Sequence, residues 1–301
     1  MSVPPSESDL LQHIYNRSAS ITDHPHIIVG PGDDAAVVDL GAQTILTVDQ
    51  LVEDRHYTPD TAIDLIARKA IARNISDIAA MGGMPRCALA AATLRRSFKH
   101  ADHLFDRMAH WAAYWNAPLV GGDIAIHDGP TVLSVTVIGV PRPARSPVLR
   151  STARPGDLLC TTGKLGNAFH SGRHLSFLPR LRESHFLCDL FAHNLTAMID
   201  ISDGLGIDAA RLATASGIRI DIDASALPLN PDCTDWRNAL SDGEDYELLF
   251  TITPDHAHKL SADTPDTPIT IIGRVSDGDG CFITSPEGES LDASSLGWNH
   301  A

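Results

Sequence analysis

The chain has 301 residues, 43% of them hydrophobic, so it can bury a large core, and its length favours two domains over one. The 38 acidic and 23 basic residues leave a formal net charge of −15, which argues against binding nucleic acid or an anionic membrane through phosphate contacts. The five cysteines have no CxxC spacing, so neither a disulfide framework nor a zinc site is predicted.

The first half of the chain is predicted to mix helices and strands. In chain order, we expect a helix at 7–16, three β-branched strands within 26–52, a helix at 62–81 that ends at two glycines, a strand at 87–94, an amphipathic helix at 99–116 and an apolar strand at 131–140. Residues 141–155 then hold four prolines and four arginines. This change of composition predicts a linker, and we place a domain boundary at 148.

The second half shows the same mixture, without a repeat of the first half at the sequence level. In chain order, we expect a strand at 156–163, a strand, turn and helix at 197–217, a half-buried strand at 218–223, and strands at 246–252 and 268–275. The predicted class is therefore α/β or α+β, with domains at 1–148 and 149–301.

The sequence predicts a soluble, cytoplasmic protein. The first residues, "SVPPSESDLLQH", lack the basic and apolar regions of a secretion signal. The longest apolar run, 131–140, is about half as long as a membrane span.

Aspartates recur at the ends of apolar strands or within Gly-rich turns. Five stretches share this feature: "GDD" at 32–34, "TVDQ" at 47–50, "NISD" at 74–77, "GGD" at 121–123 and "DISDG" at 200–204. Mg²⁺ prefers oxygen ligands, and one or two carboxylates usually hold it together with substrate phosphates and water. Five or six converging carboxylates would hold several Mg²⁺ ions, as expected where two phosphate-bearing molecules are brought together.

Each stretch also has a purely structural interpretation. Asp and Gly form turns for local backbone reasons, and "GGD" at 121–123 fits such a turn. Asp203 is a candidate N-cap, and Asp77 lies one helical turn from Arg73, where an exposed ion pair is the simplest explanation. Asp49 is harder to explain in this way, because it interrupts an apolar run and a buried carboxylate needs a partner.

Other phosphate and hydrolase motifs do not match. "TTGKLGNA" at 161–168 departs from a P-loop, because the first glycine is missing and Leu165 follows Lys164 in place of Ser or Thr. Neither a GxGxxG fingerprint after a strand nor a GxSxG nucleophile elbow is present.

Seven stretches, in this order, resemble the thiamine-monophosphate kinase family, which is related to aminoimidazole ribonucleotide synthetase. They are "GPGDDAAVV", "TVDQLVEDRHY", "KAIARNISDIAAMGGMP", "LVGGD", "DISDGL", "GEDYELLF" and the terminal "GWNH". "NISDIAAMG" together with "GEDYELLF" is specific to the family, whereas "GDD" or "SDG" alone indicates only the larger group. The resemblance implies a two-domain α/β protein of the α+β type. It also implies a homodimer in which the N-terminal sheets of the two subunits form a shared barrel.

The resemblance also implies an activity and a set of site residues. The activity is direct, in-line transfer of a phosphoryl group from ATP to thiamine monophosphate, which yields thiamine diphosphate without a covalent nucleophile. The implied Mg²⁺ ligands are Asp34, Thr47, Asp49, Asp77, Asp123, Asp200 and Asp203. The implied ATP contacts are Gly122, Asp123, Arg150 and Ser202. The implied thiamine-phosphate contacts are His56, Glu244 and Trp298, the last by ring stacking.

Some implied contacts have alternatives. From the residues alone, His56 is a polar strand-end residue and Trp298 a tail anchor. Val48, Asp54 and Ile124 depart from the family pattern, and these departures concern the thiamine contacts more than the metal cluster. A further interpretation makes the basic stretch 171–184 a mobile segment over the nucleotide.

Two kinds of rival remain. Other enzymes of the group fit less well, because selenophosphate synthetases carry a reactive cysteine or selenocysteine near the N-terminus, whereas the first cysteine here is Cys87. Hydrogenase maturation relatives end in cysteine, and "GEDYELLF" argues against aminoimidazole ribonucleotide synthesis. A non-catalytic nucleotide-binding regulator would have a broken carboxylate set, and this set is complete.

Overall fold

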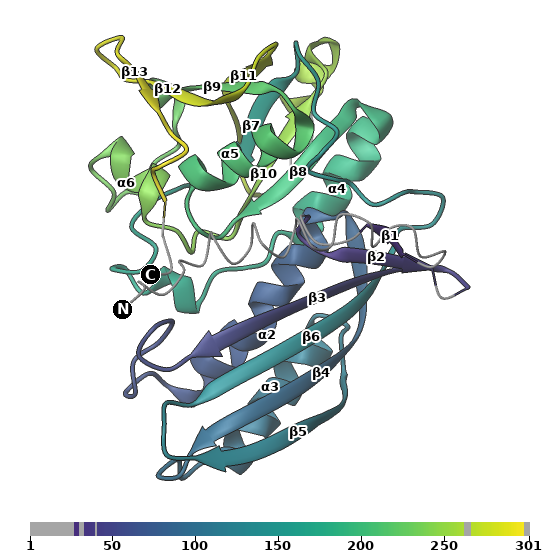
Figure 1. The fold of residues 1–301 in the computed structure, drawn as a ribbon, viewed down its shortest axis with the longest axis vertical. Coiled ribbons are helices and arrows are strands. Elements are labelled where there is room, and N and C mark those ends of the chain that lie inside the picture. The colour runs from purple at the N-terminus through teal and green to yellow at the C-terminus, as the bar shows by residue number, and fades with distance from the viewer. Residues whose placement is uncertain (1–26, 30–32, 40, 262–265, 298–301) are drawn as a thin grey trace, which may run out of the picture.

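The computed structural model describes residues 27–29, 33–39, 41–261 and 266–297. The helix predicted at 7–16 and the predicted ring of Trp298 lie outside the described residues. The described chain forms two mixed α/β halves, each built on one sheet, and α2 runs from the N-terminal half to the junction with the other (Figure 1). This arrangement confirms the predicted two-domain α/β class, while the boundary at 148 stays a prediction.

The N-terminal half is a six-stranded sheet in the order β1-β2-β3-β6-β4-β5, with two helices packed on one face (Figure 1). Neighbouring strands are antiparallel except β4 and β5, which are parallel. The elements are β1 Ile27–Val29, β2 Ala36–Asp39, β3 Gln43–Val52, α2 Ile63–Ala80, β4 Gly83–Arg95, α3 Ala101–Tyr114, β5 Leu119–His127 and β6 Val132–Pro141.

The hydrophobic pattern explains how this half packs. Alternate residues of β6, among them Leu133 and Val135, are fully buried beneath the helices, and so are Ile71 and Ile75 of α2. On β3 the same alternation turns Ile45, Thr47, Asp49 and Leu51 toward the helices, while Val48 on the opposite face is 64% exposed. Thr47 and Asp49 of β3 therefore point at α2.

The C-terminal half is a seven-stranded sheet in the order β13-β12-β9-β11-β7-β10-β8, antiparallel except for β9 and β12. The elements are β7 Leu158–Thr162, α4 Leu181–Phe191, β8 Leu195–Ile201, α5 Leu205–Ser216, β9 Arg219–Asp223, α6 Trp236–Ser241, β10 Glu247–Ile252, β11 Ile269–Ser276, β12 Gly280–Thr284 and β13 Ser290–Asp292. Ile199 and Ile201 of β8 pack with α5, whereas Met198 packs with α4 and the end of α2. Asp200 shares the face of Met198 and so points toward α2.

Most predicted elements are confirmed, but "GGD" at 121–123 is a correction. It lies in the middle of β5, not in a turn or at a strand end. β5 is an edge strand, exposed along almost its whole length, so its sequence lacks the buried alternation that identifies a strand. Among the α-helices and strands of the described residues, α4, α6, β12 and β13 were also not predicted. Among the described residues, no helix combines the length and apolar character needed to cross a bilayer.

Candidate active site

Three carboxylates from separate elements converge where α2 meets the two sheets. Asp34 lies just before β2, Asp77 in the last turn of α2 and Asp200 in β8, and each places an oxygen within 4.8 Å of the other two. A set of carboxylate oxygens at this spacing suits a hard cation such as Mg²⁺. We call these residues the carboxylate triad.

Two members of the triad accept hydrogen bonds from hydroxyl groups. Thr47 donates a hydrogen bond to Asp77, and Ser76 donates one to Asp200 at 2.6 Å. Desolvation and nearby carboxylates raise the pKa values of Asp77 and Asp200 well above their usual range. Like charges held this close favour a proton or a cation between them, so the triad fits a divalent metal ion.

The adjacent carboxylates Asp33 and Asp34 share an arginine. The Arg150 guanidinium lies 2.7 Å from an oxygen of Asp34 and 3.5 Å from one of Asp33, and its backbone N–H donates to Asp33 at 3.3 Å. Burial and the charge of Asp34 raise the pKa of Asp33 to about 6. Arg150, predicted as an ATP contact, therefore also orients Asp34 in the triad.

Asp49 is paired with Arg73 of α2 at 3.3 Å, and the same guanidinium donates to the carbonyl of Gln50 at 2.6 Å. The structural interpretation of Asp77 as the exposed partner of Arg73 is wrong. Arg73 pairs with Asp49 of β3, and Asp77 faces the other two carboxylates of the triad. Asp49 nevertheless lies near the triad, since its charge is one of the causes that raise the pKa of Asp77.

Asp203 and Ser202 form the turn between β8 and α5. The carboxylate of Asp208, in the first turn of α5, accepts the backbone N–H groups of Ser202 at 3.0 Å and Asp203 at 2.9 Å. Arg211 pairs with both Asp203 at 2.6 Å and Asp208 at 2.7 Å. Gly204, with φ of 114°, is the N-cap of α5, so Asp203 is not the N-cap considered above.

Asp123 is not brought to the triad within one chain. β6 and β4 separate β5 from β3, a span of roughly 14 Å at strand spacing. The cross-strand register runs from Asp49 through β6 and β4 to Gly122, so Asp123 points to the opposite face from Asp49. Gly122 has a packing role, because a Cβ atom there would lie 1.9 Å from the Ala90 carbonyl oxygen.

A cavity of about 270 Å³ opens beside this region, between the two halves of the chain. Four of the predicted residues line it: His56, Ser202, Asp203 and Glu244. The other lining residues are Arg55, Arg73, Phe169, His170, Ser241, Asp242, Gly243 and Tyr246.

The floor of the cavity holds a buried ionic network centred on Lys69, which is 0% exposed. Its ammonium group donates to the His56 carbonyl at 2.8 Å and to Glu244 at 2.5 Å, and it lies 2.8 Å from His174 Nδ1. Desolvation lowers the pKa of Lys69 to about 8, against the opposing effect of Glu244. Desolvation would raise the pKa of Glu244, but the hydrogen bond from His174 and the charge of Lys69 outweigh it and bring that pKa to about 2. At neutral pH both partners are therefore charged.

The backbone around Glu244 is held in an unusual conformation. Gly243, Glu244 and Tyr246 all have positive φ, at 66°, 56° and 51°. The N–H of Glu244 donates to the Ser202 carbonyl at 2.7 Å, and that of Tyr246 donates to Ile201 at 2.8 Å. Such conformations cost on the order of 1 kcal/mol each for non-glycine residues and occur preferentially at functional sites.

Comparison with known proteins identifies the family. Residues 32–141 match the family "AIR synthase related protein, N-terminal domain", and residues 154–287 match its C-terminal counterpart. The thiamine-monophosphate kinase of Bacillus subtilis is 31% identical over a gapped alignment of 328 positions, which covers 98% of this chain and 99% of that protein. That of Rhodopirellula baltica is 31% identical over an alignment of 290 positions, which covers 89% of each chain. The chain belongs to the thiamine-monophosphate kinase family.

Solved structures of this family have the same fold. The structure described as "AaThiL complexed with AMPPCP and TMP" superposes with a TM-score of 0.83 at 28% identity, covering 100% of this chain and 99% of that one. The thiamine-monophosphate kinase of Stenotrophomonas maltophilia gives a TM-score of 0.73 at 30% identity, covering 92% and 96%. A hydrogenase maturation protein, HypE, gives 0.71 at 17% identity, which shows a shared fold alone.

Several site residues of this family member were not predicted from the sequence. Lys69 and Arg73 were not predicted, although they precede the predicted Asp77 at steps of four residues and so form one charged stripe with it along α2, a signal that the 3.6-residue helix period makes visible. His174 and Phe169 come from a segment without a helix or strand pattern, and neither residue was predicted, although the basic stretch 171–184 that contains His174 was interpreted as a segment over the nucleotide.

Proposed function

We propose that this member of the thiamine-monophosphate kinase family transfers the γ-phosphoryl group of ATP to the phosphate of thiamine monophosphate, giving thiamine diphosphate and ADP. The observation that carries this proposal is the position of the carboxylate triad beside a cavity that contains both His56 and Glu244. A relative of the same fold was solved with AMPPCP and TMP, which supports the same two substrates here.

The residues of the cavity suit the two ends of the acceptor. Arg55 and Arg73 line it and offer positive charge to a phosphate. Glu244, kept ionised by Lys69 and His174, faces the cavity and suits the cationic thiazolium ring of thiamine. His56 accepts the Val52 N–H through Nδ1 at 2.8 Å, so its neutral ring carries the proton on Nε2.

The triad, together with Asp49 and Thr47, would hold Mg²⁺ between the acceptor in the cavity and the bound nucleotide. Bound there, Mg²⁺ supplies charge neutralisation between the phosphate groups of donor and acceptor. Arg150 keeps Asp34 in place for this role, and Arg211 with Asp208 fixes the turn of Ser202 and Asp203. The protein's contribution is then position and electrostatic stabilisation, since the acceptor oxygen is already ionised at neutral pH.

The reaction is tested by incubating the purified protein with ATP, Mg²⁺ and thiamine monophosphate and measuring the products by chromatography. We expect thiamine diphosphate and ADP in equal amounts. With ATP made chiral at the γ-phosphorus, a single in-line transfer inverts the configuration. ATP hydrolysis without thiamine diphosphate would overturn the proposed acceptor, and retention of configuration would overturn the direct transfer.

We further infer that the active form is a homodimer that pairs the N-terminal sheets. β5 is a long edge strand whose side chains Val120, Ile124 and Ile126 are 64%, 59% and 63% exposed. An apolar edge of this length favours pairing with another strand. Asp123 does not reach the carboxylate triad of its own chain. Pairing of the two sheets would allow it to contribute to the triad of the second copy. Light scattering measures the assembly, and Ile124→Lys is expected to yield monomers without activity.

A further inference from the structure

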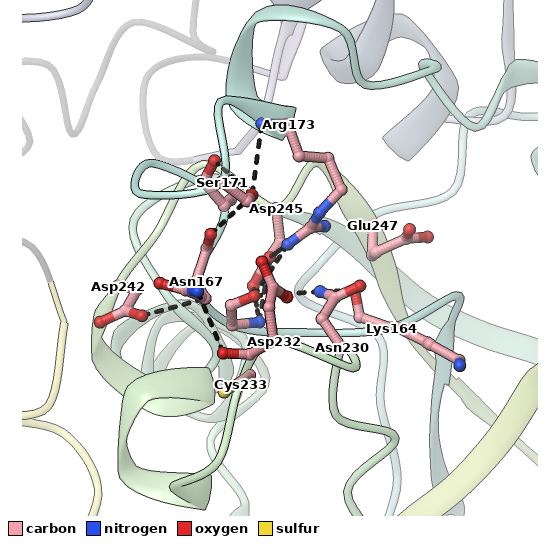
Figure 2. Close-up of polar contacts among 12 residues, drawn as sticks. Lys164, Asn167, Ser171, Arg173, Asn230, Asp232, Cys233, Asp242, Asp245 and Glu247 are labelled. Atoms are coloured by element: carbon pink, nitrogen blue, oxygen red, sulfur yellow. Dashed lines mark hydrogen bonds and ion pairs between the residues drawn. The ribbon is translucent and has the colours of Figure 1, made fainter.

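A segment of the C-terminal half runs along the cavity and is held by the "GEDYE" stretch. We call residues 167–180 the strap. At its start, Asp245, whose side chain is fully buried, accepts the N–H of Gly166 and pairs with Arg173 at 3.0 Å. Figure 2 shows the Arg173 side chain reaching across to Asp245, with Asn167 tied to Asp242 beside it by a hydrogen bond of 2.9 Å.

The rest of the "GEDYE" stretch continues this pairing with the strap. Glu244 pairs with His174 at 2.9 Å, and Glu247 pairs with Arg180 at 2.5 Å. The ring of Tyr246 stacks on that of Phe177, with centroids 3.9 Å apart. The strap is therefore fixed along its length against the start of β10. Its first residues lie at the cavity that holds Glu244.

The strap presents one aromatic ring to the cavity. Phe169 lines the cavity and is 44% exposed, although it is a large apolar side chain. Its ring stacks on that of His174, with centroids 4.4 Å apart and planes 22° apart. The stack covers one face of Phe169, and the residue nevertheless keeps 44% of its surface exposed. Among the described lining residues, Phe169 alone is apolar and this exposed, since Tyr246 is 2% exposed.

The cavity around Phe169 also contains charged side chains. The ionised Glu244 contacts the same His174 on which Phe169 stacks, and Glu244 and Phe169 both line the cavity. An aromatic face beside a carboxylate suits a flat, cationic heterocycle. Arg55 and Arg73 elsewhere on the cavity wall suit the phosphate of the same molecule.

We propose that Phe169 is a specificity-determining residue that stacks on the heterocycle of the phosphate acceptor, and that the Arg173–Asp245 ion pair positions it. This proposal rests on the proposed function, because the acceptor is taken to be thiamine monophosphate. It assigns the recognition of the organic part of the acceptor to the strap, a role separate from that of the carboxylate triad.

The test compares Phe169→Leu with a matched control, Phe282→Leu, at a partly exposed residue of β12 that does not line the cavity. Loss of the aromatic face is expected to raise the KM for thiamine monophosphate about tenfold, with kcat and the KM for ATP within about twofold of the wild type. Phe169→Tyr is expected to restore the KM. An unchanged KM for thiamine monophosphate, or a rise in the KM for ATP instead, would overturn the proposal.

The positioning role is tested with Arg173→Gln, which keeps Phe169 and leaves Asp245 free to take up a proton. We expect a higher KM for thiamine monophosphate at unchanged kcat, and rescue by Arg173→Lys. Wild-type values in Arg173→Gln would overturn that role.

Calorimetric titration with thiamine monophosphate separates this inference from the proposed function. If the wild type binds the ester without phosphorylating it, the proposed function fails, and weaker binding by Phe169→Leu still supports the stacking role. If the wild type is an active kinase and Phe169→Leu behaves like Phe282→Leu, only the stacking role fails.

Discussion

Replacing Lys69 by methionine isolates the electrostatics of the cavity floor. The substitution leaves the ionised Glu244 with His174 as its remaining partner and removes the donor to the His56 carbonyl. Removing one partner of a buried pair costs about 3–5 kcal/mol. Because the Glu244 side chain is 17% exposed, we expect the lower end, about 3 kcal/mol of unfolding free energy. In a chain of 301 residues that corresponds to a fall in Tm of roughly 5 °C.

The intact pair, in contrast, adds little net stability. The low pKa of Glu244, about 2, contributes stability that is present above its ordinary value of 4.5 and lost as the pH falls through 2. Lys69, with a pKa of about 8 against an ordinary 10.5, costs stability at neutral pH, and this cost disappears as the pH rises from 8 to 10.5. The two shifts are similar in size and opposite in effect. Glu244→Gln combined with Lys69→Met is therefore expected to be less destabilised than Lys69→Met alone.

The assay is urea unfolding at pH 7 without ligands, on the wild type, both single variants and the double variant. We predict a coupling energy of about 3 kcal/mol between the two positions. A coupling energy below about 1 kcal/mol, or a double variant less stable than either single one, would refute the interpretation of the floor as one ionic unit.

Three further predictions concern the strap, the dimer and the edge strand. Burial raises the pKa of Asp245 to about 7 from an ordinary 3.8, so its contribution to stability falls as the pH rises from about 4 to 7. Asp245→Asn should flatten that dependence in urea midpoints measured at pH 5 and pH 8, and an equally steep dependence would contradict this. Asp123→Asn and Asp77→Asn should each be inactive, whereas a mixture with exchanged subunits should recover about a quarter of the wild-type rate, because one site in each mixed dimer is complete. No recovery would place Asp123 outside the site of the second copy. Gly122→Ala forces a Cβ atom to within 1.9 Å of a backbone oxygen and should cost roughly 1–3 kcal/mol in urea unfolding, more than Gly121→Ala, whose Cβ would meet a side chain at 3.3 Å.

The sequence predicts the parts of the site that lie on strongly patterned elements. Asp77 and Asp200 were found because a long helix without glycine or proline and a buried apolar strand each end close to them. These residues were expected to share one site, and the structure places them with Asp34 within 4.8 Å. The pattern of β3 likewise fixes the face to which Thr47 and Asp49 point.

What the sequence did not predict depends on contacts between distant segments. Arg150 meets Asp34 across more than a hundred residues, and no local pattern encodes that pair. β5 was missed because an edge strand has no buried face to impose alternation. Phe169 reaches the cavity only because the strap is fixed to "GEDYE", which the packing of the C-terminal half determines.

The most direct test of metal-supported phosphoryl transfer is a Mg²⁺ titration of thiamine diphosphate formation. It compares the wild type with Asp77→Asn and with Asp128→Asn, a control whose side chain is 79% exposed in a surface ion pair with Arg96. We predict that the control follows the wild type, and that Asp77→Asn loses roughly 100-fold or more in kcat at saturating substrates and requires more Mg²⁺. A variant at position 77 that keeps the wild-type rate and the wild-type Mg²⁺ dependence would contradict the assignment of the carboxylate triad.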